Sequence, residues 1–179
     1  LAVMPSPPVA RRASWLWITA PWCSPQKGST RCIRSSLRNC GDEVQAALSL
    51  DAGDYLTVVG DVQSNDKVTL KSVGQTHIIG SVSSGTDMDV TANGDLMVDG
   101  DLTASGAMTL LSDGYAGIAG DVNSVSDLTI TAGSDVVVGG TVNSGAGLGV
   151  TAIGGINMGG SVTSVGGATL NSGSDIDAN

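Results

Sequence analysis

The sequence has few aromatic residues, a single histidine and only three cysteines. Of its 179 residues none is Phe, two are Tyr and three are Trp. An interior made of Val, Leu, Ile and Met without Phe or Trp favours a slender cross-section. No stretch approaches the roughly 18 apolar residues that would span a bilayer, so we expect no transmembrane segment. The odd number of cysteines argues against a complete set of disulfides.

Pro, Cys, Trp and basic residues are scarce in most of the chain because they concentrate in residues 1–40. All five Pro, all three Cys, all three Trp and six of the eight Lys and Arg lie there, whereas none of the 17 acids does. Residues 1–40 therefore carry a charge of +6 and residues 41–179 a charge of −15. This contrast predicts two segments that do not fold as one unit, an irregular head (1–40) and a repeat domain (41–179).

Three interpretations of the head are open. Arg11 and Arg12 precede an apolar run over residues 13–18, which faintly resembles a secretion signal, but Pro21 and Trp22 stand where small residues would precede cleavage. A zinc site would need paired ligands, and the head's cysteines are widely spaced with no His nearby: Cys23, Cys32 and Cys40. We favour an unstructured or misassigned segment without a function of its own.

Residues 41–179 repeat with a period of 20. Written in rows of 20, they align without an insertion, and each full row ends in glycine: Gly60, Gly80, Gly100, Gly120, Gly140 and Gly160. Such a regular register predicts a repeat architecture. A second column of small residues lies within the rows: Gly74, Gly94, Gly114, Ser134, Gly154 and Ser174. We expect corners at both columns, because glycine permits positive φ and close backbone approach.

Each row contains apolar residues spaced two apart, which indicates extended strands with one inward face. One such pair lies near the middle of the rows: Leu48/Leu50, Val68/Leu70, Met88/Val90, Met108/Leu110, Leu128/Ile130, Leu148/Val150 and Ala168/Leu170. Another lies near their ends: Leu56/Val58, Thr76/Ile78, Leu96/Val98, Ala116/Ile118, Val136/Val138 and Ile156/Met158. A single apolar column opens the rows: Val62, Val82, Leu102, Val122, Val142 and Val162. Each row therefore predicts three short strands.

One such row cannot bury its apolar face alone, whereas identical rows stacked on each other form parallel sheets around a continuous interior. The pattern predicts an all-β fold, a parallel β-helix of about seven 20-residue coils. At a strand spacing of roughly 4.8 Å the rod would be about 33 Å long. We expect right-handed winding, because parallel crossovers are overwhelmingly right-handed.

The rows also resemble a known repeat. Residues 80–100 (GSVSSGTDMDVTANGDLMVDG) and residues 121–140 (DVNSVSDLTITAGSDVVVGG) are similar to the 20-residue repeats of filamentous haemagglutinin-type adhesins. These are exoproteins of bacterial two-partner secretion, related to haemolysins and contact-dependent inhibition toxins. The resemblance implies a right-handed shaft, export through an outer-membrane transporter, and adhesion or haemagglutination at a host-cell or bacterial surface through glycan or protein. It places the protein outside the cell or on its outer surface.

The chain departs from that family in two respects. It contains no Asn-Pro pair, a motif of the family's amino-terminal secretion domain, and it has far fewer coils. We therefore expect a fragment of a longer shaft, or the product of a degenerate gene. Exposed strand edges at the terminal coils would favour end-to-end self-association.

Carboxylates are the candidates for chemistry. Asp87 and Asp89 are expected on one outward face, and Asp101 and Asp121 share a column in adjacent coils, about 5 Å apart. Such a pair can bind a cation or share a proton, but acids on the solvated face of an acidic protein also serve solubility. We favour solubility and expect no catalytic, metal or cofactor-binding residues and no cofactor.

The remaining polar residues favour a structural role over catalysis. Lys67 and Lys71 are expected to form cross-coil ion pairs with Asp87 and Asp51, and His77 to lie outward on a strand. Calcium-binding repeats use a nine-residue period, which is absent here, and an acidic rod repels nucleic acid. Columns of Thr and Asn, such as Asn123 on Asn143, are expected to support neighbouring strands.

The sequence thus predicts the shaft or binding surface of an adhesin and not an enzyme. The alternative class, a carbohydrate-active β-helix enzyme, would require inserted loops that carry Arg, Lys or His, and the rows contain no insertion.

Overall fold

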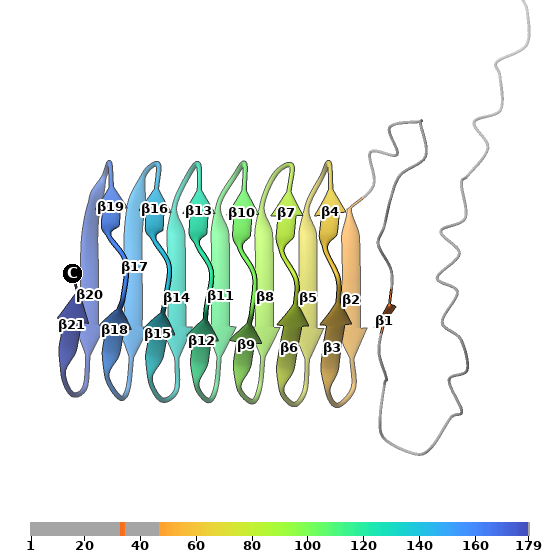
Figure 1. Cartoon of the computed structure of the whole chain (residues 1–179), viewed down its shortest axis with the longest axis horizontal. Helices are drawn as coiled ribbons and strands as arrows, with labels where there is room; N and C mark the ends of the chain where they lie inside the picture. The colour runs from red at the N-terminus through yellow and green to blue at the C-terminus, as the bar shows by residue number, and fades with distance from the viewer. Residues whose placement is uncertain (1–32, 35–46, 179) are drawn as a thin grey trace, which may run out of the picture.

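A computed structural model describes residues 33–34 and 47–178 of the chain. Its elements are all β-strands, arranged as three parallel sheets that wind into a solenoid (Figure 1). The coils advance from right to left in the view, while the chain rises along the near side and descends along the far side. This is the expected right-handed winding. The described residues contain no helix with the length and hydrophobicity that a bilayer span requires.

Each of the seven coils gives one strand to the seven-stranded and eight-stranded sheets, and six strands of the described residues form the third sheet. The seven-stranded sheet is formed by β2 (Leu48–Ala52), β5 (Val68–Ser72), β8 (Met88–Ala92), β11 (Met108–Ser112), β14 (Leu128–Ala132), β17 (Gly147–Ala152) and β20 (Gly167–Ser172). The six-stranded sheet is formed by β4 (Val62–Ser64), β7 (Val82–Ser84), β10 (Leu102–Ala104), β13 (Val122–Ser124), β16 (Val142–Ser144) and β19 (Val162–Ser164). Seven coils are present, as the sequence predicts.

The eight-stranded sheet has one strand more than the number of coils. It is formed by β1 (Ile33–Arg34), β3 (Leu56–Val59), β6 (Thr76–Ile79), β9 (Leu96–Val98), β12 (Ala116–Ile118), β15 (Val136–Val138), β18 (Ile156–Met158) and β21 (Ile176–Ala178). The additional strand is β1, which pairs in parallel with β3 and places Ile33 opposite Val58. The expected domain boundary at residue 40, the apolar run 13–18 and the cysteines lie outside the described residues.

Every coil stacks on the next with a shift of 20 residues. Leu110, for example, lies between Val90 and Ile130 in the seven-stranded sheet. The predicted inward columns form the core, and Val68, Leu70 and Val150 are completely buried. In the last coil the same columns are more open, because no coil covers them: Ile176 is 48% exposed, whereas its predecessor Ile156 is 2% exposed.

The corner glycines act mainly through close approach rather than through positive φ. Among the described glycines of the row-ending column, only Gly60 and Gly80 have positive φ. At Gly100 and Gly160 a Cβ atom would collide with the carbonyl group of the preceding coil's glycine. The stacked corners are therefore too close for a side chain.

Candidate functional surface

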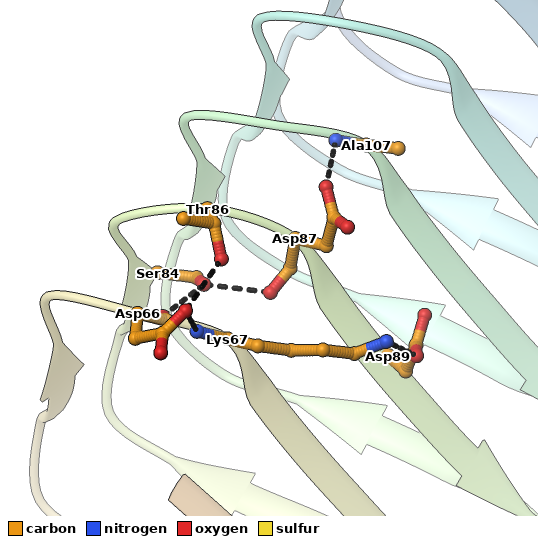
Figure 2. Close-up of polar contacts among 7 residues, drawn as sticks. All are labelled: Asp66, Lys67, Ser84, Thr86, Asp87, Asp89 and Ala107. Atoms are coloured by element: carbon orange, nitrogen blue, oxygen red, sulfur yellow. Dashed lines mark hydrogen bonds and ion pairs between the residues drawn. The ribbon is translucent and has the colours of Figure 1, made fainter. Parts of the chain in front are cut away.

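The corner that leads into the seven-stranded sheet contains a network of polar contacts between coils (Figure 2). The Asp66 carboxylate accepts hydrogen bonds from the Lys67 backbone N–H at 2.8 Å and from the Thr86 hydroxyl at 3.3 Å. One coil on, the Asp87 carboxylate accepts a hydrogen bond from the backbone N–H of Ala107 at 2.9 Å. The acids at this corner therefore link each coil to its neighbour.

Each coil turns at three corners, one between each strand and the next. The contact made by Asp87 recurs at all three of them. In each case an aspartate Oδ1 atom accepts a hydrogen bond from the backbone N–H of the residue 20 positions later, which lies at the equivalent place in the next coil. The pairs are Asp61–Ser81, Asp87–Ala107, Asp95–Tyr115, Asp101–Asp121, Asp121–Thr141, Asp127–Gly147 and Asp135–Gly155, with N···O distances of 2.6–3.0 Å. The carboxylate satisfies a backbone donor at the corner, where the sheet ladders are interrupted.

Glycine in the next coil makes room for most of these carboxylates. A Cβ atom added to the residue 19 positions after the aspartate would overlap the aspartate Oδ1 atom, and this holds at Gly106, Gly114, Gly120, Gly140 and Gly154. At the corner of Asp127 the equivalent residue is Ala146, so a methyl group is accommodated there. The corner unit is thus an aspartate, followed 19 residues later by a small residue and 20 residues later by a backbone donor.

Buried serines join the same corners from the inside. The Ser84 hydroxyl contacts the Asp66 carbonyl oxygen at 2.9 Å and the Asp87 carbonyl oxygen at 2.7 Å, which belong to adjacent coils. Ser124 and Ser144 repeat this pair of contacts. Every buried side-chain nitrogen and oxygen within the described residues has a hydrogen-bond partner. The inward column that contains these serines, the serine column, therefore favours a hydroxyl as well as a small side chain, because each hydroxyl contacts carbonyl oxygens of two adjacent coils.

The structure corrects two of the predicted electrostatic pairs. Lys67 lies 2.6 Å from Asp89 rather than pairing with Asp87, because the Asp87 carboxylate faces the next coil (Figure 2). Within residues 47–178 no ion pair joins Lys71 to Asp51, although the two residues are opposite each other in β5 and β2. The hydrogen bond and the charge of Asp89 raise the pKa of Lys67 above its ordinary value.

The other candidate residues lie as follows. Asp101 and Asp121 are linked through the carboxylate of the first and the backbone N–H of the second, at 2.9 Å, so their carboxylates serve the coil stack. His77 lies on the outward side of β6, as expected, with its Nε2 atom 3.2 Å from Asp99 Oδ2. Within the described residues no three His, Cys, Asp or Glu side chains are grouped closely enough to hold a metal ion.

The outward faces of the sheets differ from the corners in charge. On the six-stranded sheet the outward residues are uncharged: Gln63, Ser83, Thr103, Asn123, Asn143 and Thr163. Asn143 Nδ2 donates a hydrogen bond to Asn123 Oδ1 at 2.8 Å, which confirms the predicted asparagine stack. On the seven-stranded sheet the outward side chains of the first three coils include Asp51, Lys71 and Asp89.

From β11 onward the outward side of the seven-stranded sheet is uncharged. We call this surface the uncharged face; its residues are Thr109, Leu111, Thr129, Thr131, Gly149, Thr151, Thr169 and Asn171. Exposed aliphatic side chains flank it at the corners: Val125, Ile153 and Val165, which are 66%, 73% and 80% exposed. Two acids also lie at its rim, Asp113 and Asp127.

Comparison with protein families decides what kind of repeat this is. The haemagglutinin repeat family matches residues 43–114 and 113–179, which is most of the chain. The chain belongs to the haemagglutinin repeat family. No curated protein and no solved structure matches it significantly.

Hydrogen bonds to the next coil account for the many aspartates that flank the corners of these haemagglutinin repeats. Sequence reasoning assigned the acids to solubility and missed their bonds to the next coil. A signal was present: most of these aspartates are followed 19 residues later by glycine, as in Asp101 with Gly120 and Asp135 with Gly154. Membership in an adhesin-type repeat family agrees with the expectation of a repeat protein that is not an enzyme.

Proposed function

We propose that this chain forms part of the shaft of a secreted or surface-exposed bacterial adhesin and carries a binding surface on that shaft. The observation that supports this most is the unbroken stack of seven coils within a haemagglutinin repeat family. A stack held by parallel sheets and by side-chain bonds at three corners is a stiff spacer. Such a spacer places a binding surface away from the cell that bears it.

Cell binding by the purified polypeptide tests this proposal. The full chain, labelled with a fluorophore, is incubated with epithelial cells, erythrocytes and bacteria, and bound label is measured by flow cytometry. We expect saturable binding that unlabelled chain displaces. The control is the same chain after heat unfolding, which retains composition and charge. Binding that is equal before and after unfolding, or absent from every cell type, would contradict a role in adhesion.

The transport route and the association state are part of the same proposal. Export would use the outer-membrane transporter of two-partner secretion, as in relatives of this family. A polypeptide that ends at Asn179 would associate end to end through its last coil, where Leu170 and Ile176 are open. Sedimentation velocity over a hundredfold range of concentration tests this, and a monomer throughout would contradict it.

Two alternatives make different predictions. A carbohydrate-active enzyme of this architecture predicts inserted loops, whereas the described coils keep a uniform 20-residue spacing. A shallow surface depression does lie over β15, β18 and β21, lined in part by Asp135, Asn157 and Asp177. Release of reducing sugar from polysaccharide would favour the enzyme. A non-functional product of a degenerate gene predicts that the chain is never detected in culture supernatant.

A further inference from the structure

The uncharged face differs in charge from the acidic corners of the rod and from the first three coils of the same sheet, whereas the outward residues of the six-stranded sheet are also neutral. Residues 41–179 carry a charge of −15, yet all eight outward residues of the uncharged face are neutral. The charges of the same sheet lie in its first three coils, which contain Asp51, Lys71 and Asp89. Charge on the sheet is thus separated along the axis of the rod.

The central threonine hydroxyls of this face have no hydrogen-bond partner among the residues that the structure describes. Among residues 47–178, no hydrogen bond is made by the side chains of Thr129, Thr131 or Thr151. By contrast, the hydroxyls of Thr76 and Thr86 bond to Ser72 and Asp66. Each free hydroxyl can donate one hydrogen bond and accept others. The χ1 angle of threonine is also restricted, so little rotamer freedom is lost when such a group binds a ligand.

The size of the face indicates what can occupy it. Four strands about 4.8 Å apart and some 17–20 Å long present roughly 300 Å². A stable protein–protein interface needs about 800 Å² from each partner, so neither a second copy nor another folded protein is well matched to this surface. An oligosaccharide of a few residues is matched in size.

Charge and chemistry narrow the class of sugar. Asp113 and Asp127 at the rim, together with the acidic corners, repel sialylated and sulfated glycans. Uncharged hexoses present hydroxyls that both donate and accept, and aliphatic C–H groups that suit the threonine methyls, Leu111 and Ile153. The threonine columns run along the axis with the strand spacing, which is comparable with the repeat of one hexose in a linear glycan.

We propose that the uncharged face binds uncharged oligosaccharides, with Thr129, Thr131 and Thr151 supplying the hydrogen bonds. This inference rests on the proposed adhesin function and names its ligand class and its site. Binding at a single face is weak because no aromatic platform is present there. A multivalent display is therefore needed for detection.

The test uses the full chain, biotinylated at its amino terminus and assembled on streptavidin. The probes are immobilised uncharged oligosaccharides of hexoses and N-acetylhexosamines, with their sialylated and sulfated counterparts beside them. We expect binding to one or more uncharged probes and none to the anionic counterparts. The triple variant Thr129→Val, Thr131→Val, Thr151→Val should lose about tenfold or more in apparent affinity, since it removes hydroxyls and keeps the branched shape.

A matched control separates the site from general effects. The triple variant Thr57→Val, Thr69→Val, Thr103→Val changes outward threonines elsewhere on the rod and should bind as the unmodified chain does. Circular dichroism and thermal unfolding confirm that both variants keep the fold. Equal affinity of the two triple variants, or preference for anionic probes, would overturn the inference. Cell binding without any binding to uncharged probes would also overturn it and leave the adhesin function standing.

Discussion

Asp101 Oδ1 accepts a hydrogen bond from the backbone N–H of Asp121 at 2.9 Å, one coil further along the rod. The Asp121 carboxylate in turn accepts a hydrogen bond from the backbone N–H of Thr141 at 2.7 Å. Each carboxylate therefore accepts a hydrogen bond from a backbone N–H of the next coil. Where the donating residue is itself an aspartate, as Asp121 is, its carboxylate makes the same contact with the coil after that. The corner is held by side chains where the sheet ladders are interrupted.

Replacement of Asp101 tests the contribution of this contact. Asp101→Ala removes the acceptor and leaves the N–H of Asp121 to water, so we expect a loss of about 1 kcal/mol in the free energy of unfolding. Asp101→Asn keeps a carbonyl acceptor in the same place and should lose less than half as much. Urea unfolding monitored by circular dichroism measures both. Equal losses for the two variants would assign the effect to charge rather than to the hydrogen bond.

The glycines that face these carboxylates give a second prediction. In Gly120→Ala the new methyl group would overlap Asp101 Oδ1 and the carbonyl of Gly100, so we expect a loss of about 2–3 kcal/mol. Gly149→Ala is the matched control, because a Cβ atom at Gly149 meets no atom within 4 Å. It should change stability by no more than about 0.5 kcal/mol. Chemical unfolding of both proteins gives the comparison, and similar losses would contradict the close-approach explanation.

Most of the fold could be predicted from the sequence, because the alternation of apolar residues determines which side of a strand is buried. Ile78 and Ile79 are chemically identical neighbours, yet the first is fully buried and the second is 39% exposed. Their positions in the 20-residue row distinguish them. Because the same inward and outward positions recur in every row, each further coil supports the same assignment.

The contacts at the corners were harder to predict because they depend on side-chain direction. Lys67 and Asp87 lie in the same column of adjacent coils, which suggested a pair, but the Lys67 side chain reaches Asp89 instead. The column places the two residues near each other and leaves the direction of each side chain open. Free backbone donors at the corners decide that direction for Asp87, and they are visible only in three dimensions.

Substitutions in the serine column are expected to lower stability at one position and to preserve or raise it at another. Ser124→Ala removes the hydroxyl that contacts the carbonyl oxygens of Gly106 and Asp127, both of which keep a backbone donor, and we expect a loss of about 1 kcal/mol. Ala104 occupies the same column without a hydroxyl and is completely buried. Ala104→Ser restores the recurring contact and should leave stability unchanged or raise it by up to about 1 kcal/mol. Thermal unfolding distinguishes the cases, and a loss in both variants would mean that only size matters.

The pKa of Lys67 provides the final prediction. Its hydrogen bond with Asp89 and the charge of Asp89 raise this pKa above the ordinary value of 10.5, whereas Asp87 contributes a smaller attraction. A raised pKa in the folded state means that the ion pair stabilises the fold below the unfolded-state pKa and loses this effect as pH rises through the folded-state pKa. Asp89→Asn should therefore lower the pKa of Lys67 more than Asp87→Asn does. An NMR titration of the lysine side-chain signals between pH 8 and about 12 measures both shifts. A larger shift in the Asp87 variant would restore the pairing that the sequence alone suggested.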